Sequence, residues 1–144
     1  MNATIAKFGY PASLLHEYRS WVVLLRPSQP TLGSLVLACK DEATSLGAVA
    51  AEAYAELAIA AGDLERALRA ALQCQKFNYL ALMMVDPHVH FHVIPRYSEP
   101  REFEGGTYRD AAWPKPPDVT SALALTPAQM AALHARLRTA WARP

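Results

Sequence analysis

The sequence has little cysteine, little net charge and no long apolar run. Only Cys39 and Cys74 are cysteines, too few for a disulfide framework and typical of reduced thiols in the cytoplasm. The formal net charge is +1 without a long basic run, so we expect no nucleic-acid partner. No stretch approaches the roughly 20 apolar residues of a membrane span. Residues 1–7 lack the charged lead and apolar core of a secretory signal, so we expect a cytoplasmic protein without membrane contact.

The composition that remains is that of a globular chain. Hydrophobic residues make up 52% and charged residues 19%, which argues for a packed core over disorder. A length of 144 residues fits one domain of this kind. We therefore expect a single domain over 1–144, with its core at about 10–97 and an irregular loop plus a C-terminal helix over 98–144.

Three of the five histidines stand at every second position of one segment, 88–94. Side chains of a β-strand alternate between its two faces. If the segment is a strand, His88, His90 and His92 share one face and the apolar residues between them share the other. One face would then be core and the other a site. A packed or surface histidine is the usual finding for a lone one, but three in register favour chemistry.

Two kinds of chemistry suit such a row of imidazoles. They can ligate a metal, or they can serve as nucleophile, acid and phosphate-binding donors. The outer two start roughly 13 Å apart on a flat strand, whereas zinc holds each nitrogen at only about 2.0–2.1 Å. A metal could thus take two of the three at most and would need ligands from elsewhere. The other histidines, His16 and His134, are expected in a hairpin and a helix, so we predict no metal but leave this alternative open.

The whole pattern His88-Val89-His90-Phe91-His92-Val93-Ile94, continued by Pro95-Arg96, resembles the signature of the histidine triad (HIT) superfamily of nucleotide hydrolases and transferases. The resemblance extends more weakly over residues 10–97. It implies an α+β fold with an antiparallel β-sheet, a long helix packed on it and a C-terminal helix. It also implies a homodimer, formed through the region of the long helix, and no cofactor.

The resemblance assigns roles to the three histidines. His90 would attack the α-phosphate of a nucleotide and form a covalent nucleotidyl intermediate that water resolves. His92 would contact the transition state or the leaving group, and His88 would support the phosphate site. The physical logic agrees, because the attacking nitrogen must be unprotonated while the opposite ring nitrogen is held by an acceptor.

The other elements are predicted from apolar periodicity and from turn residues. A capping box, with Thr126 as N-cap and Gln129 at the third position, marks the start of the last helix. The predicted elements are an arm over 1–12, strands over 13–18, 21–25, 34–39 and 77–85, a loop over 26–33, a helix over about 44–74, an irregular loop over 98–120 and a helix from 127 to about 141.

Two loops depart from the pattern of the superfamily. Many members carry a further active-site histidine and a ribose-contacting polar residue around the second hairpin, where this chain has Gly33 and Leu25. Typical members also have a Gln and a Ser or Thr shortly before the triad, where this chain has Met84 and Val85 in what we expect to be a short apolar connection. Met83 and Met84 in this segment are expected to fill core space.

Four residues are candidates for substrate binding. Arg96 follows the triad and is a plausible phosphate neighbour. Arg26 and Asn78 are the polar groups nearest the two altered loops, although Arg26 could be a solvated charge and Asn78 a structural amide. Trp113 could stack on a nucleotide base, or it could anchor the long loop that contains it.

Three functions follow from these observations. The first is an enzyme that cleaves at the α-phosphate through His90. The second is a regulatory module that binds a nucleotide with little catalysis, which the altered loops favour. The third, a protein that binds a metal through two triad histidines, has the least support.

Overall fold

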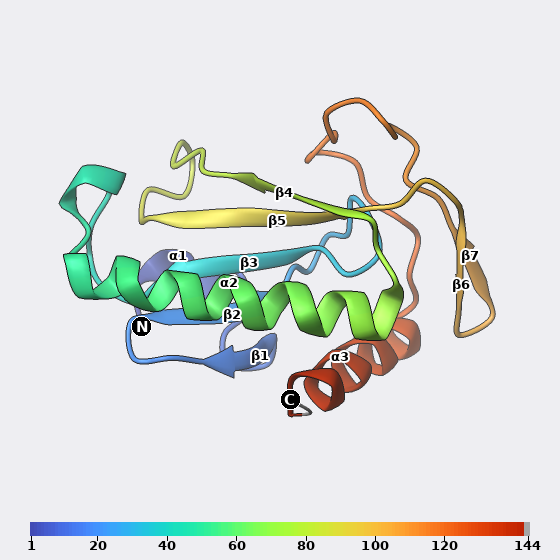
Figure 1. Ribbon diagram of the computed structural model, residues 1–144, viewed down its shortest axis with the longest axis horizontal. Coiled ribbons are helices and arrows are strands. Elements are labelled where there is room, and N and C mark those ends of the chain that lie inside the picture. The colour runs from blue at the N-terminus through green and yellow to red at the C-terminus, as the bar shows by residue number, and fades with distance from the viewer. Residues whose placement is uncertain (143–144) are drawn as a thin grey trace.

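The computed structural model describes residues 1–142, and its centre is a five-stranded antiparallel sheet with the strand order β1-β2-β3-β5-β4 (Figure 1). The predicted α+β class with an antiparallel sheet is confirmed. Residues 143 and 144, at the end of the predicted C-terminal segment, lie outside the described residues. The strands are β1 (Leu14–Glu17), β2 (Trp21–Leu25), β3 (Leu35–Cys39), β4 (Lys76–Leu80) and β5 (His90–Arg96).

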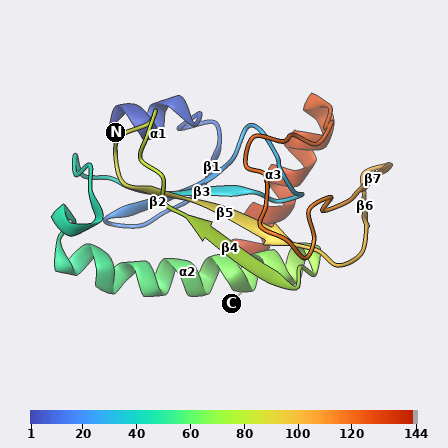
Figure 2. The same ribbon diagram turned by 90° about the horizontal axis from the view of Figure 1, so that it is seen from above.

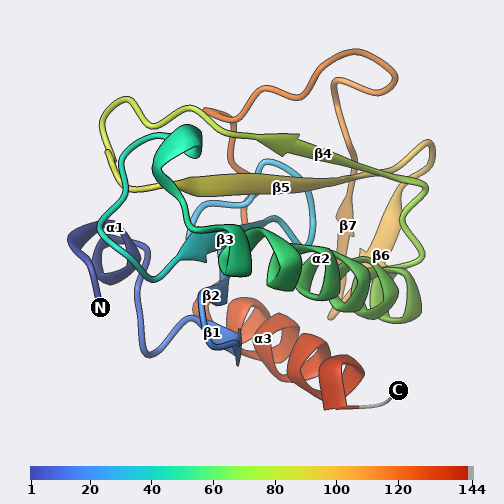
Figure 3. The same cartoon turned by 60° about the vertical axis from the view of Figure 1, so that its left-hand side comes forward.

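One face of the sheet is covered by two helices that lie side by side, α2 (Ala51–Leu72) and α3 (Pro127–Ala142) (Figure 3). Leu64 and Leu68 of α2 are fully buried in this layer, which forms the larger hydrophobic core. The capping box of α3 forms as predicted, since Gln129 N donates to Thr126 Oγ1 and Thr126 N donates to Gln129 Oε1. Both predicted helices are therefore confirmed as elements.

The long helix begins later than its sequence predicts. Residues 44–50 are not α-helical, because Leu46–Ala48 form a short 3-10 helix, η1, and Val49 is extended with ψ 137°. Val49 is buried in the core, and an extended backbone carries its side chain there ahead of the first helical turn. Apolar periodicity reports this burial but does not distinguish the two backbone conformations.

The opposite face is covered by a short helix, α1 (Ala3–Lys7) (Figure 2). The prediction of an irregular arm over 1–12 is therefore wrong for residues 3–7. Asn2 caps this helix by accepting a hydrogen bond from Ile5 N. Its amide also donates to the backbone O of Cys39, the last residue of β3, and to that of Asp41, two residues further on. These bonds hold α1 against the sheet on the side away from α2.

The strand predicted over 77–85 is shorter than expected. β4 ends at Leu80, which pairs with His92, and residues 81–89 form a loop. Met84 and Val85 are both 83% exposed. The connection is therefore neither short nor packed, and Met84 does not fill the core as predicted. Because β4 is an edge strand and β5 begins only at His90, residues 81–85 have no strand to pair with.

The segment 98–120 is only partly irregular. It contains a two-stranded hairpin of β6 (Arg101–Phe103) and β7 (Gly106–Tyr108). The turn consists of Glu104 and Gly105, both with positive φ. Strands of three residues are too short for alternation to reveal, so the sequence predicts only a loop here.

Among residues 1–142 no helix is both long enough and apolar enough to cross a membrane.

Candidate active site

His90 and His92 lie on the face of β5 that α1 covers, whereas Val93 packs in the core on the α2 side. In register, His90 pairs with Ala38 and His92 with Val36 of β3. The strand begins only at His90, so the prediction that His88 belongs to it is wrong. The prediction of one histidine face and one core face is confirmed for the other two.

The ring of His90 is held by the backbone of its own segment. Its Nδ1 lies 2.7 Å from His88 O. A carbonyl oxygen can only accept a hydrogen bond, so Nδ1 carries a proton. In a neutral imidazole the other nitrogen, Nε2, then holds the lone pair. This is the tautomer that a nucleophilic histidine requires.

His92 has the opposite arrangement. Arg26 Nε donates a hydrogen bond to Nδ1 of His92 over 3.3 Å. Because a guanidinium has only donors, Nδ1 accepts and the ring proton of neutral His92 lies on Nε2. Burial, the positive charge of Arg26 and the neighbouring His90 lower the pKa of His92 to about 4. His92 is therefore a neutral hydrogen-bond donor at neutral pH.

His88 uses both ring nitrogens on protein groups. Thr4 Oγ1 lies 2.9 Å from its Nδ1 and Glu42 Oε2 lies 3.0 Å from its Nε2. Thr4 Oγ1 also accepts a hydrogen bond from the backbone N–H of His88. These contacts hold the residue whose backbone carbonyl accepts the hydrogen bond from Nδ1 of His90. The geometry places His88 as a support behind the ring of His90.

The aromatic ring of Phe8, just after α1, contacts both strand histidines. Its centroid lies 5.6 Å from that of His90 and 5.8 Å from that of His92, and the two imidazoles are 5.0 Å apart. Lys7 and Asp86, whose side chains lie 2.6 Å apart, tie α1 to the β4–β5 loop. His90 is only 2% exposed, and the ring of Phe8 is part of its cover. Phe8 and Thr4 could not be predicted as site residues, because a five-residue helix shows no usable periodicity.

Three of the four predicted substrate-binding residues lie together, but not at the histidines. Asn78, Arg96 and Trp113 line a cavity of about 670 Å³ between β4 and the loop 113–117. Arg96 is four residues beyond His92, or about 13 Å along the strand. Its guanidinium donates to both carboxylate oxygens of Asp110, at 2.6 and 3.2 Å, and to Asn78 Oδ1 and the backbone O of residue 115, each at 2.7 Å. Their contact with a substrate stays a prediction, and their present contacts are structural.

Arg26 is the fourth predicted residue and the one that reaches the triad. Gly33, aligned with the missing histidine, faces the other way: a Cβ there would lie 2.5 Å from Leu72 Cδ1, and its φ is +86°. Leu25 is likewise buried in the core on the α2 side. Neither position can present a polar group to the histidine face. The cation beside His92 comes instead from Arg26.

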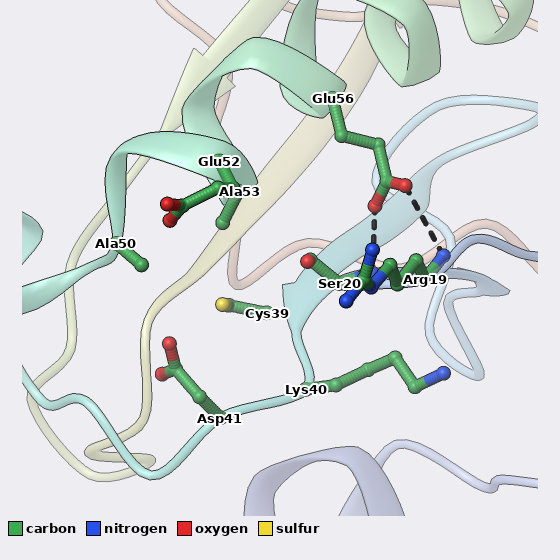
Figure 4. A pocket seen from close by; sticks show the side chains of 9 residues that line it. All are labelled: Arg19, Ser20, Cys39, Lys40, Asp41, Ala50, Glu52, Ala53 and Glu56. Carbon is green, nitrogen blue, oxygen red and sulfur yellow. Dashed lines mark hydrogen bonds between the residues drawn. The ribbon is translucent and has the colours of Figure 1, made fainter.

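A second cavity of about 670 Å³ lies near the N-terminal end of α2 (Figure 4). Glu56 on its wall accepts hydrogen bonds from the backbone N–H groups of Arg19 and Ser20. The thiol of Cys39 also faces it, and burial raises the pKa of that thiol. Cys39 packs with the core on the α2 side, so the sheet separates this cavity from the histidines.

The two remaining histidines do not join the triad. His16 stacks on Trp141 and meets Tyr18 edge-on, and His134 Nε2 contacts Leu14 O. Within residues 1–142 no group of three or more His, Cys, Asp and Glu side chains is arranged to hold a metal ion.

No protein-family model and no curated protein sequence matches this chain. Solved structures, in contrast, match over nearly its whole length. A histidine triad protein from Marinobacter aquaeolei has a TM-score of 0.75 and 22% identity, covering 99% of this chain and 96% of its own. One from Sinorhizobium meliloti has a TM-score of 0.73 and 17% identity, covering 96% and 94%. A zinc-bound family protein from Mycobacterium smegmatis has a TM-score of 0.65 and 18% identity, covering 96% and 90%.

These likenesses reach from α1 to α3 and include the strand that bears His90 and His92. At such low identity they speak for the fold and not for a particular activity. The chain has the histidine triad fold, which confirms at the level of the fold the resemblance carried by the segment 88–96.

Proposed function

We propose that the protein is a nucleotidyl hydrolase or transferase that cleaves at the α-phosphate of a nucleotide through a covalent adduct on His90. The observation that carries the proposal is the 2.7 Å contact between His90 Nδ1 and His88 O. It leaves the lone pair of the neutral ring on Nε2, a nitrogen that forms no hydrogen bond with residues 1–142. The neighbouring ring, His92, offers a proton on its own Nε2, so the pair combines a nucleophile with a donor.

The reaction has two balanced steps. In the first, Nε2 of His90 forms a bond to the α-phosphorus while the bond from phosphorus to the leaving group breaks, and the leaving group takes the electron pair. The ring becomes cationic, and its Nδ1–H bond to His88 O strengthens as that charge develops. In the second step water, or another acceptor hydroxyl, attacks phosphorus and loses its proton to the solvent, while the N–P bond breaks, its electron pair returns to Nε2 and neutral His90 is restored. His92 donates to the phosphate oxygens or to the leaving group.

The experiment is incubation of the purified protein with a panel of nucleotides that carry phosphoanhydride or phosphoramidate bonds at the α-phosphate. We expect at least one to be cleaved, and cleavage to be lost in His90→Ala. His16→Ala is the matched control, because this histidine lies outside the triad and stacks on Trp141. If every nucleotide survives at high protein concentration, the proposal is wrong.

A second candidate is a regulatory module that binds a nucleotide with little catalysis. The loop 81–89 favours it, because exposed apolar side chains, Met84 and Val85, stand where typical members place phosphate-binding groups. Calorimetry that shows tight nucleotide binding without turnover would support this candidate. Turnover that depends on His90 would exclude it.

We also propose that two copies associate, as the resemblance implies. The free edge of β4 and the outer face of α2, where Ile59 is 60% exposed, are the surfaces available for it. Analytical ultracentrifugation of wild type and Ile59→Asp tests this, and a monomeric wild type would contradict it.

The cytoplasm stays the proposed location, since the two buried cysteines are both free thiols.

A further inference from the structure

Each of the three guanidinium nitrogens of Arg26 donates a hydrogen bond. NH1 donates to Ser28 O at 2.9 Å and NH2 donates to Val119 O at 3.0 Å. These two bonds orient the planar fork, so the N–H on Nε points at Nδ1 of His92 over 3.3 Å. Two loops far apart in the sequence thus hold one cation against one nitrogen of a triad histidine.

We propose that Arg26 is a positioning residue that locks His92 as the neutral tautomer with its proton on Nε2. This inference rests on the proposed function for its consequence, but not for its geometry. In the sequence, Arg26 is a candidate substrate contact. The structure assigns it a further task, because its Nε–H is bound to Nδ1 of His92 while Ser28 O and Val119 O hold the rest of the fork in place.

The chemical reason lies in what a guanidinium cannot do. It has no acceptor atom and stays protonated at neutral pH, so a histidine nitrogen beside it can only accept. A lysine could supply the charge, but not the same rigid fork. A histidine or an amide at this place could both donate and accept, and would leave the tautomer of His92 open.

The other groups that face His92 do not impose this state. Phe8, just after α1, makes a T-shaped ring contact with His92, and His90 on the same strand makes another. Asp86, in the β4–β5 loop, favours the protonated ring, but its carboxylate is paired with Lys7. Arg26 is thus the group that decides between the two neutral tautomers. His92 can then donate from Nε2 beside the nucleophile without first taking up a proton.

The direct test is nitrogen NMR of the full-length protein labelled at the histidine ring nitrogens, with the His92 signals assigned by their loss in His92→Gln. At neutral pH we expect Nδ1 of His92 to show a pyridine-type shift and Nε2 a pyrrole-type shift. In Arg26→Met we expect a mixture of tautomers, and a rise of about one unit in the titration midpoint of His92. Arg26→Lys, which keeps a cation that can donate but not accept, should keep the tautomer and raise the midpoint less.

Arg101→Met is the matched control. Arg101 also binds backbone carbonyls, those of Leu72 and Gln73 among them, but it does not contact the triad. It should leave the His92 signals unchanged. A pyrrole-type Nδ1 in the wild type overturns the proposal, and so does a wild-type tautomer in Arg26→Met. If Arg26→Met does not fold, the wild-type spectrum and the Arg26→Lys titration still decide.

Activity gives a separate reading. If a nucleotide of the panel is turned over, the acid limb of the kcat profile should move to higher pH in Arg26→Met, while Arg101→Met follows the wild type. If no nucleotide is turned over, the proposed function fails but the NMR result still stands for or against the role of Arg26.

Discussion

The two ends of β5 carry polar side chains on a strand that is otherwise apolar, yet they are built in opposite ways. At one end, Arg96 donates four hydrogen bonds and forms an ion pair with Asp110, both side chains being at most 5% exposed. At the other end, the strand histidines His90 and His92 each bind other groups of residues 1–142 through Nδ1 alone. The Arg96 end is saturated in the sense that four of its five N–H donors are bound, whereas each histidine keeps Nε2 unused.

The comparison shows that residue type alone does not identify a site. An arginine after a histidine triad looks like a phosphate ligand in the sequence, but a guanidinium whose donors are already used has little left for a ligand. A histidine with one nitrogen fixed and the other unused is prepared for chemistry. The saturated end of β5 should therefore matter for stability, and the histidine end for reaction.

The largest expected effect is at the histidine end. His90→Ala should lower kcat/KM for any nucleotide that is turned over by about 10⁴-fold or more, since it removes the group that bonds to phosphorus. The free energy of unfolding should change far less than the activity. Steady-state kinetics beside urea unfolding measures both. Comparable kcat/KM in wild type and His90→Ala would show that the histidine end of β5 does not carry the reaction.

The next effect is at the saturated end. Arg96→Met leaves Asp110 buried without its cation and should lower the free energy of unfolding by about 3–5 kcal/mol. The double variant Arg96→Met with Asp110→Leu, which removes both charges, should recover most of the loss. Urea unfolding measures the two. If the single variant is as stable as the wild type, Arg96 is not structural, and its role as a substrate ligand regains support.

A smaller effect concerns pH. The pKa of folded His92, about 4, lies below its value of about 6.5 in an unfolded chain. Between these values the unfolded state binds more protons, so the free energy of unfolding falls as the pH falls through this window, by about 2 kcal/mol for this group. Urea unfolding at pH 7 and pH 4.5 should show a weaker pH dependence in His92→Gln. An identical dependence would mean that His92 is not buried neutral.

The smallest effect concerns the cover over the histidines. Phe8→Ala removes a half-buried ring and should lower the free energy of unfolding by about 1 kcal/mol. Because Phe8 contacts both rings, its loss should speed the acylation of His90 and His92 by a histidine-directed reagent. Peptide mass mapping follows the modification, with the partly exposed His16 as internal reference. Unchanged rates would show that Phe8 does not control access.

Much of the fold could be predicted because its elements are periodic. The hairpin of β1 and β2, the long helix and the capped last helix all repeat an apolar spacing or carry a cap, such as Thr126 with Gln129. What could not be predicted depends on contacts between distant segments. The pairing of Arg96 with Asp110, the reach of Arg26 to His92 and the cover by Phe8 leave no periodic trace in the sequence.

At the histidine end of β5, the sequence predicts which face the histidines share, but not where the strand begins or which residues bind His88. Alternation correctly predicts that His90 and His92 share one face. It also assigns His88 to the strand, which in fact begins two residues later, at His90. Its ring is bound by Thr4 and Glu42, 84 and 46 residues away. The loop 81–89 was misjudged because strand-like apolar residues need a neighbouring strand, and β5 begins too late to provide one.

The most direct test of a reacting His90 is to find the reacted atom. The wild-type protein is mixed with a nucleotide that it cleaves, quenched within one turnover in base, where phosphorylated imidazole survives best, and digested for mass mapping. We predict a nucleotidyl group on His90 in the wild type and in His16→Ala, and none in His90→Ala. An adduct on another residue, or turnover that persists in His90→Ala, would contradict the account.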